Sequence, residues 1–208
     1  MATCYIVGAG DFTPRGLYPA QEDFVIAADG GYRALQSVSI QPDLLMGDLD
    51  SLGADYPLPA GLPVERFPAQ KDDTDTGIAL AKGWELGYRD FALYGCGGGR
   101  IDHLLANFQS MGRYSRMGAS IRLVDENYIA YALTNGSLTL PSRPAGTLVS
   151  VFCHGSAAEG VNLQGLFYPL ENHTLTADFP LGVSNQHTAQ PAEISVRNGT
   201  LLIIQHWK

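Results

Sequence analysis

The stretch FALYGCGGGRIDHLLANFQSMGRYSRM, residues 91–117, decides the fold of this chain. It opens with a short apolar run, passes through three consecutive glycines and continues into an amphipathic segment, Asp102–Met117. Asp102 stands where the N-cap of a helix is expected. Apolar side chains then recur at helical spacing, at Leu104, Phe108 and Met111. The pattern predicts a strand, a glycine-rich loop and a helix, the unit from which parallel sheets with covering helices are built.

The same alternation extends over the first two thirds of the chain. Short apolar runs predict strands at Thr3–Val7, Phe24–Ala28, Leu44–Met46, Val64–Phe67, Phe91–Tyr94 and Ile121–Val124. Two further helices are predicted over Tyr32–Val38 and Thr74–Leu86. Several of the runs are apolar throughout, as strands covered on both faces are. We therefore expect an α/β fold whose sheet is mostly parallel and doubly wound, with helices on its faces.

After about Leu140 the helical patterns stop. Strand-like runs follow at Leu148–Phe152, Val161–Leu163, Phe167–Leu170, Ile194–Arg197 and Thr200–Gln205. Asn198-Gly199, between the last two runs, is a strong signal for a tight hairpin turn. These features predict a smaller all-β antiparallel sandwich. Turn-forming residues cluster around Thr134–Pro144, and we place the boundary there, between a domain of residues 1–138 and one of residues 139–208.

The composition of the chain limits the partners that it can bind and the cellular compartment in which it is expected. The chain has 208 residues, with 13 Lys and Arg against 21 Asp and Glu. This acidity argues against nucleic acid or an anionic membrane as a partner. The three cysteines are widely spaced, the N-terminus lacks a secretory signal pattern, and no apolar stretch is long enough to span a membrane. We therefore expect a cytoplasmic protein.

The acidity is concentrated in one region. Residues 1–140 hold 17 of the 21 acids, and eight of these lie between Asp43 and Asp75. Asp48 and Asp50 directly follow a predicted strand, and in an extended chain they would project to the same side. Paired carboxylates at the carboxyl end of a parallel strand suit Mg²⁺ holding the phosphates of a substrate. A solvated aspartate-rich turn is the alternative interpretation.

A second acidic cluster opens the helix predicted over Thr74–Leu86. Lys71, Asp72, Asp73 and Asp75 stand there within five residues. Acids in the first turn of a helix ordinarily complement its dipole, which explains one or two of the three. A cation-assisted site would use Asp72 or Asp75 as a ligand or base, and Lys71 as a counter-charge to phosphate.

The loop at Gly97–Gly99 is a candidate phosphate cradle. Consecutive glycines let the backbone approach a ligand closely, and the following helix N-terminus favours an anion. Arg100 would add a bidentate phosphate contact. His103 and Asn107 lie four residues apart and face one way. The alternatives are a glycine-rich turn and a structural histidine, since the spacing matches neither a Walker A loop nor a dinucleotide fingerprint.

Five motifs, in this order, resemble the thiamine pyrophosphokinase family. They are ADGG at 28–31, PDLLMGDLDS at 42–51, KDDTD at 71–75, GGGRIDH at 97–103 and GVSN at 182–185. The resemblance implies an α/β nucleotide domain followed by a β-sandwich domain. It also implies transfer of pyrophosphate from ATP to the hydroxyl of thiamine, giving thiamine diphosphate and AMP. In this family the site is completed across a homodimer, so we expect a homodimer here.

The resemblance also implies roles for individual residues. Its catalytic acids correspond to Asp48, Asp50, Asp72 and Asp75, and its Mg²⁺ ligands to Asp48, Asp50 and Asp75. The residues that bind ATP in the family correspond to Asp29, Gly30, Ser51, Lys71, Thr74, Gly98, Arg100, Asp102 and His103. Ser184 and Asn185 match the thiamine-binding pair. Tyr168 is a candidate contact for the thiamine ring.

Two other classes of protein would use parts of the same pattern. A Mg²⁺-dependent hydrolase of nucleotides or sugar phosphates needs the acidic edge but turns over without thiamine. A nucleotide-binding or thiamine-binding sensor needs the cradle but not the paired acids, and it shows no turnover. Conversion of ATP to AMP that depends on thiamine separates both from the kinase.

Overall fold

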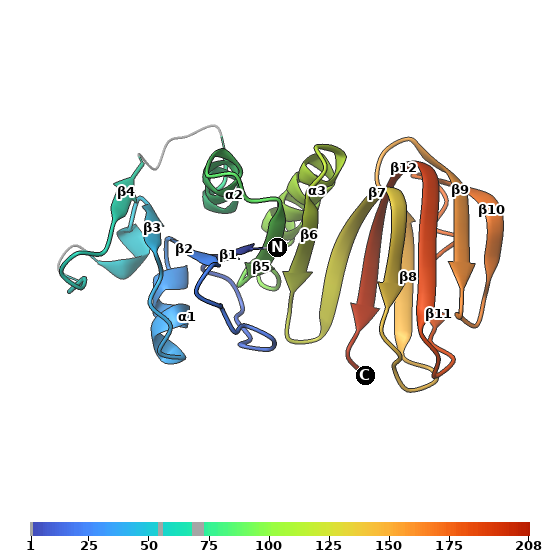
Figure 1. Ribbon diagram of the computed structural model, residues 1–208, viewed down its shortest axis with the longest axis horizontal. Helices are drawn as coiled ribbons and strands as arrows, with labels where there is room; N and C mark the ends of the chain where they lie inside the picture. Colours follow the sequence, from blue (N-terminus) through green and yellow to red (C-terminus); the bar gives the residue numbers. More distant parts are fainter. Residues whose placement is uncertain (1, 54–55, 68–72) are drawn as a thin grey trace. The chain divides into compact units, whose positions relative to one another are not determined.

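The computed structural model describes residues 2–53, 56–67 and 73–208. The chain forms two compact units, made of residues 1–107 with 123–126 and of residues 108–122 with 127–208 (Figure 1). The division therefore crosses helix α3 (Ile101–Arg116) and strand β6 (Ser120–Val124). The boundary predicted at residue 138 falls within strand β7 (Tyr128–Leu140) and stays a prediction.

The first unit contains a parallel sheet with the strand order β5-β1-β2-β3-β4. The strands are β1 (Thr3–Val7), β2 (Phe24–Ala28), β3 (Leu44–Gly47), β4 (Val64–Arg66) and β5 (Asp90–Tyr94). Every pairing among these five strands is parallel, which confirms the predicted α/β class. Strand β1 is buried along its whole length, as its apolar sequence requires. The strand order reverses beside β1, so a crevice is expected at the carboxyl ends of β1 and β5.

Helices α1 (Gly31–Ser37) and α2 (Asp75–Glu85) lie on opposite faces of this sheet (Figure 1). Thr74 caps α2, because its Oγ1 accepts a hydrogen bond of 3.0 Å from the backbone N–H of Gly77. The N-cap predicted at Asp102 is wrong: α3 begins at Ile101, which puts Asp102 in the first turn. None of the helices in the described chain has the length and apolar character that crossing a membrane requires.

The second unit is antiparallel and rich in strands. After β7 come β8 (Leu148–Cys153), β9 (Ala157–Gln164), β10 (Leu170–Thr176), β11 (Asn185–Gln186) and β12 (Ala192–His206). Strand β12 pairs with β7, β8 and β9, and β10 and β11 extend the sheet. Inward-facing aliphatic side chains form the core, including Leu140, Val149, Val151, Leu163, Ile194 and Leu201. No helix occurs in residues 140–208, so the predicted all-β character is confirmed.

Two local predictions for this unit are wrong. Asn198-Gly199 does not form a hairpin, because β12 continues through it and the pairing with β7 shifts register there. Gly199 has φ +118° and donates its N–H to Oδ1 of Asn135 at 2.8 Å, so its positive φ serves a bulge rather than a turn. The strand predicted at Phe167–Leu170 begins only at Leu170. Pro169 has no N–H to give to a ladder, which accounts for the delay.

Candidate functional site

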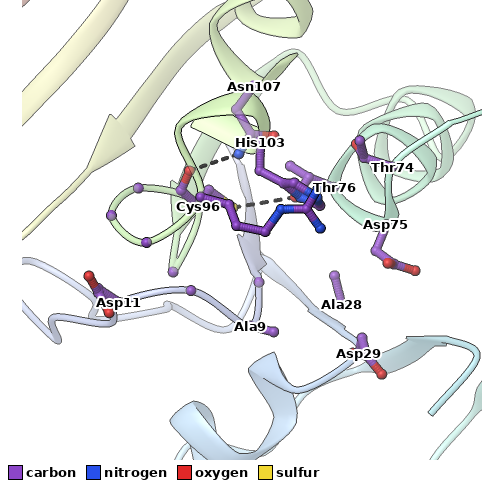
Figure 2. Close-up of a pocket in the computed structure, with 17 residues that line it drawn as sticks. Ala9, Asp11, Ala28, Asp29, Thr74, Asp75, Thr76, Cys96, His103 and Asn107 are labelled. Carbon is purple, nitrogen blue, oxygen red and sulfur yellow. Dashed lines mark hydrogen bonds between the residues drawn. The ribbon is translucent and has the colours of Figure 1, made fainter. Parts of the chain in front are cut away.

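A cavity of about 480 Å³ lies at the carboxyl ends of β1, β2 and β5. Two glycine-rich segments line it, Gly8–Asp11 after β1 and Gly95–Gly99 after β5. Side chains of α3, the start of α2 and the end of β2 complete the lining (Figure 2). The cavity therefore occupies the crevice expected where the strand order of a parallel sheet reverses.

The structure brings six of the predicted site residues to this cavity. They are Asp29, Thr74, Asp75, Gly98, Arg100 and His103. Figure 2 shows Asp29 and Asp75 together at one end of the cavity and Asp11 at the other. Gly30 follows Asp29 and directly precedes α1. The cavity therefore has carboxylates at both ends, and the glycine loop and Arg100 are among its other lining residues.

The Arg100 guanidinium is paired within its own motif. Its Nε and Nη2 donate to the two carboxylate oxygens of Asp102 at 3.1 and 2.5 Å. The hydrogen bond from Arg100 lowers the pKa of Asp102 to about 2, although both side chains are largely exposed. Asp102 thus occupies the fork that could otherwise hold a phosphate in the same bidentate way.

Asp29 has an unsatisfied carboxylate oxygen. Its backbone has φ +50°, and its N–H donates to the carbonyl of Met46 at 2.7 Å. Oδ1 of Asp29 is buried and has no hydrogen-bond partner among the described residues. Because buried carboxylate oxygens are rarely left unpaired, this position suits a cation or a donor group of a ligand.

Asp48 and Asp50 line a second cavity of about 200 Å³, together with Tyr56 and Arg66. The chain between the two acids is not extended, because Leu49 has φ +62° and a short 3₁₀ helix, η1 (Asp50–Leu52), begins at Asp50. Oδ1 of Asp48 accepts a hydrogen bond of 3.1 Å from the N–H of Asp50. The two acids thus share a cavity through a tight turn, not through the alternation of an extended strand.

The predicted metal set stays a prediction. Asp75 lines the first cavity, whereas Asp48 and Asp50 line the second. Within residues 2–53, 56–67 and 73–208, no group of three or more His, Cys, Asp or Glu side chains is placed to hold a metal ion. Lys71 and Asp72 lie outside the described residues, and of Ser51 only the backbone, in η1, is described.

In the second unit, Asn185 uses its side chain to hold the backbone. The residue is 3% exposed, and its Nδ2 donates to the Tyr168 carbonyl at 2.7 Å. Its Oδ1 accepts from the N–H groups of Tyr168 and Gln186 at 2.9 and 2.8 Å. Ser184 beside it is exposed, with φ +57°. Asn185 thereby fixes Tyr168, whose exposed ring packs edge-on against that of Phe167.

Sequence reasoning missed the segment Gly8–Asp11, which forms one wall of the first cavity. The available signal was a pair of glycines, Gly8 and Gly10, directly after a buried strand. A lone pair of glycines is a weak motif, and its role became visible only from the position of β1 in the sheet.

A glycine-lined cavity at the switch point of a parallel sheet, followed along the chain by a β-rich unit, defines a class of two-unit α/β proteins that bind ligands at the carboxyl ends of their strands. Within that class, residues 17–123 match the family model described as "Thiamin pyrophosphokinase, catalytic domain". Residues 136–201 match the one described as "Thiamin pyrophosphokinase, vitamin B1 binding domain". The chain belongs to the thiamin pyrophosphokinase family.

Individual relatives match along nearly the whole chain. A thiamine pyrophosphokinase of Bacillus subtilis (strain 168) is 26% identical over 214 residues, covering 99% of each protein. The crystal structure of thiamine pyrophosphokinase from Bacillus subtilis superposes with a TM-score of 0.87 at 25% identity, covering 98% of each chain. A family protein from Enterococcus faecalis gives a TM-score of 0.83 at 27% identity, covering 100% of each chain. These matches confirm the family and the two-part architecture.

Proposed function

We propose that this chain transfers a pyrophosphoryl group from ATP to thiamine with the help of Mg²⁺, giving thiamine diphosphate and AMP. Membership of the family makes the chain a thiamine diphosphokinase. The observation that supports the detailed assignment is the first cavity, where glycine-rich backbone meets Arg100 and the carboxylates of Asp29 and Asp75.

The ATP polyphosphate would lie along the glycine loop. Backbone N–H groups of Gly97–Gly99 and the N-terminus of α3 are suited to an anion, and Arg100 adds a fork of donors. His103 and Thr74 line the same cavity and would contact the nucleotide. Asp102 would be released from Arg100 as a phosphate takes its place. Lys71, on the segment before α2, would add a further counter-charge.

Mg²⁺ fits the donor set of this region. Carboxylate oxygens are the ligands that Mg²⁺ prefers, and Asp48, Asp50 and Asp75 would hold it. The unpaired buried oxygen of Asp29, which lines the first cavity with Asp75, offers a further hard ligand. When bound, the cation neutralises the polyphosphate charge and favours in-line displacement.

Thiamine would bind through the second unit. Exposed Ser184 and the aromatic ring of Tyr168, held in place by Asn185, would contact the vitamin. Asp72 or Asp75 would take the proton of the thiamine hydroxyl. The hydroxyl oxygen then bonds to the β-phosphorus, and the bond from that phosphorus to the bridging α,β-oxygen breaks, so that AMP departs with the bond electrons.

We also propose that the active species is a cytoplasmic homodimer with sites completed across the interface. Exposed apolar side chains of the second unit support an association surface: Phe167, Tyr168, Phe179, Leu181 and Val183. Comparison of specific activity and sedimentation at falling protein concentration tests this. Full activity in a monomeric sample would contradict a shared site.

The central experiment incubates the protein with ATP, Mg²⁺ and thiamine and follows the products by chromatography. We expect thiamine diphosphate and AMP in equal amounts, with both lost when EDTA removes the cation. Release of ADP, or nucleotide hydrolysis that does not need thiamine, would favour a hydrolase. Ligand binding without any turnover would favour a sensor.

A further inference from the structure

The glycine-rich loop of the first cavity is fixed from the side of α3 by Asn107. This residue is 5% exposed, and its Nδ2 donates a hydrogen bond of 2.7 Å to the carbonyl oxygen of Cys96 (Figure 2). Cys96 directly precedes Gly97–Gly99, the segment that would receive the phosphates. The amide therefore sets the orientation of the peptide from which that segment starts.

The thiol of Cys96 is held in place by its contacts and is unreactive at neutral pH. Its thiol donates to the carbonyl of Tyr94 at 3.2 Å and lies 3.6 Å from Oγ1 of Thr76. Burial raises the pKa of the Cys96 thiol to about 11, which keeps it protonated at neutral pH. Cys96 therefore serves as a fixed link between β5, α2 and the loop rather than as a nucleophile.

The segment Gly8–Asp11 holds the same loop from the side of β1. The N–H of Gly8 donates to the carbonyl of Tyr94, and the N–H of Gly10 to the carbonyl of Gly95, both at 2.8 Å. An antiparallel bridge then pairs Asp11 with Gly97. A Cβ atom at Gly10 would lie 2.8 Å from the carbonyl oxygens of both Gly95 and Gly97, so only glycine fits there.

We propose that Asn107 and the segment Gly8–Asp11 are positioning elements for nucleotide binding. They hold the Gly95–Gly99 backbone in the conformation that receives the polyphosphate. The segment Gly8–Asp11 precedes residue 17, where the match to the family catalytic domain begins. The proposal rests on the proposed function in taking the ligand to be ATP. Preorganised N–H groups bind an anion without a cost of reordering, so release of the loop weakens binding.

The test compares Asn107→Leu and Gly10→Ala with Gly136→Ala. Gly136 lies in β7, where a Cβ would approach no atom closer than 3.6 Å. Titration calorimetry with a non-hydrolysable ATP analogue and Mg²⁺ gives Kd, steady-state kinetics give KM for each substrate, and thermal unfolding gives Tm. Asn107→Leu leaves the Cys96 carbonyl without its partner, and a Cβ at Gly10 would clash with the carbonyl oxygens of Gly95 and Gly97, so we expect Kd and KM for ATP to rise about tenfold in these two variants. KM for thiamine should stay unchanged in both variants. In the control, Gly136→Ala, the Kd and KM for ATP should also stay unchanged.

The Gly10→Ala variant separates positioning from direct contact, because glycine has no side chain with which to touch the nucleotide. A lower Tm with unchanged Kd in the folded variants would show a merely structural role and overturn the proposal. If Asn107→Leu fails to fold, Asn107→Asp replaces it, since this change keeps the shape but turns an oxygen toward the Cys96 carbonyl. A protein that binds the analogue but forms no thiamine diphosphate would refute the proposed function. The positioning proposal would still be tested in that case, because it depends only on the Kd values measured for the analogue.

Discussion

The two units build their candidate binding surfaces in opposite ways. In the first unit two segments of the cavity wall are glycine-rich backbone, whose geometry depends on the absence of side chains at Gly8, Gly10 and Gly95. In the second unit a buried side chain, Asn185, holds the backbone of Tyr168 through its amide. Adding an atom should therefore damage the first surface, whereas removing one should damage the second. The charged side chains stand apart from both arrangements, because in the proposed function they act on the substrate itself.

The largest effect is expected from Asp50→Asn, which removes charge without changing shape. If Asp50 holds Mg²⁺, kcat for AMP formation should fall about 10²- to 10³-fold, in line with the loss of other electrostatic stabilisers. Rates are measured with saturating ATP, thiamine and Mg²⁺. The matched control is Glu22→Gln, an exposed acid of the same unit. Normal AMP release by the Asp50 variant would remove this residue from the catalytic set.

Gly31→Ala tests the sensitivity of the first unit to an added atom. A Cβ at Gly31 would lie 1.8 Å from the carbonyl oxygen of Val7, inside the buried strand β1. Because this backbone cannot move aside, we expect the free energy of unfolding to fall by about 3 kcal/mol in urea titrations.

The matched change in the second unit is Gly112→Ala, where a Cβ would come within 2.1 Å of the His154 ring. A side chain can rotate away, so a loss of only about 1 kcal/mol is expected. Equal losses for the two alanine variants would break the contrast between backbone and side-chain neighbours.

Asn185→Ala tests the second scheme, in which a side chain supports the backbone. It leaves the N–H and C=O of Tyr168 without their partner, which should cost about 1–3 kcal/mol of stability. KM for thiamine should rise, while Kd for the ATP analogue stays constant. Gln164→Ala, an exposed amide of β9, is the control. A change in nucleotide affinity would show that the binding surface of the second unit affects the cavity of the first.

The smallest expected effect is on the pH dependence of stability, and it again concerns residues of the second unit. Burial, with a contribution from Arg143, lowers the pKa of His187 below its ordinary value of 6.5, and burial lowers that of His154 as well. The unfolded chain therefore takes up these protons first, so stability is full above pH 6.5 and declines as the pH falls below it.

Each histidine contributes a slope of at most about 1.4 kcal/mol per pH unit in this range. Urea unfolding between pH 5 and 8 measures the slope, which should be shallower in His187→Gln than in the protein without the substitution. An unchanged slope in the His187 variant would show that its proton affinity is the same in both states.

Local sequence patterns predicted much of this fold where composition or near neighbours decide the element. The apolar run at Thr3–Val7 indicated a buried strand by its composition, and the helix after Thr74 needed only near neighbours; both agree with the structure. The hairpin at Asn198-Gly199 failed because its competitor, the pairing of β12 with β7, lies far away in the sequence. The role of Asn185 was hidden for the same reason, since its partner Tyr168 is 17 residues away.

The candidate site divides along similar lines. The segment holding Arg100 and His103 could be placed from its strand, loop and helix pattern alone. The turn at Leu49 and the wall at Gly8–Asp11 could not, because each depends on backbone conformation or on which strands are neighbours. The sequence gives the chemical groups of each residue directly, whereas which strands lie next to each other is known only from the folded structure.

The pairing of Arg100 with Asp102 has a consequence for how the nucleotide exchanges. The protein carries its own anion at the place where a phosphate would bind, so arrival of the ligand swaps one counter-ion for another. At this contact, binding would release few small ions to the solvent, and affinity would respond weakly to added salt. Each nucleotide that binds there would also free the carboxylate of Asp102, and each AMP that leaves would allow the ion pair to form again.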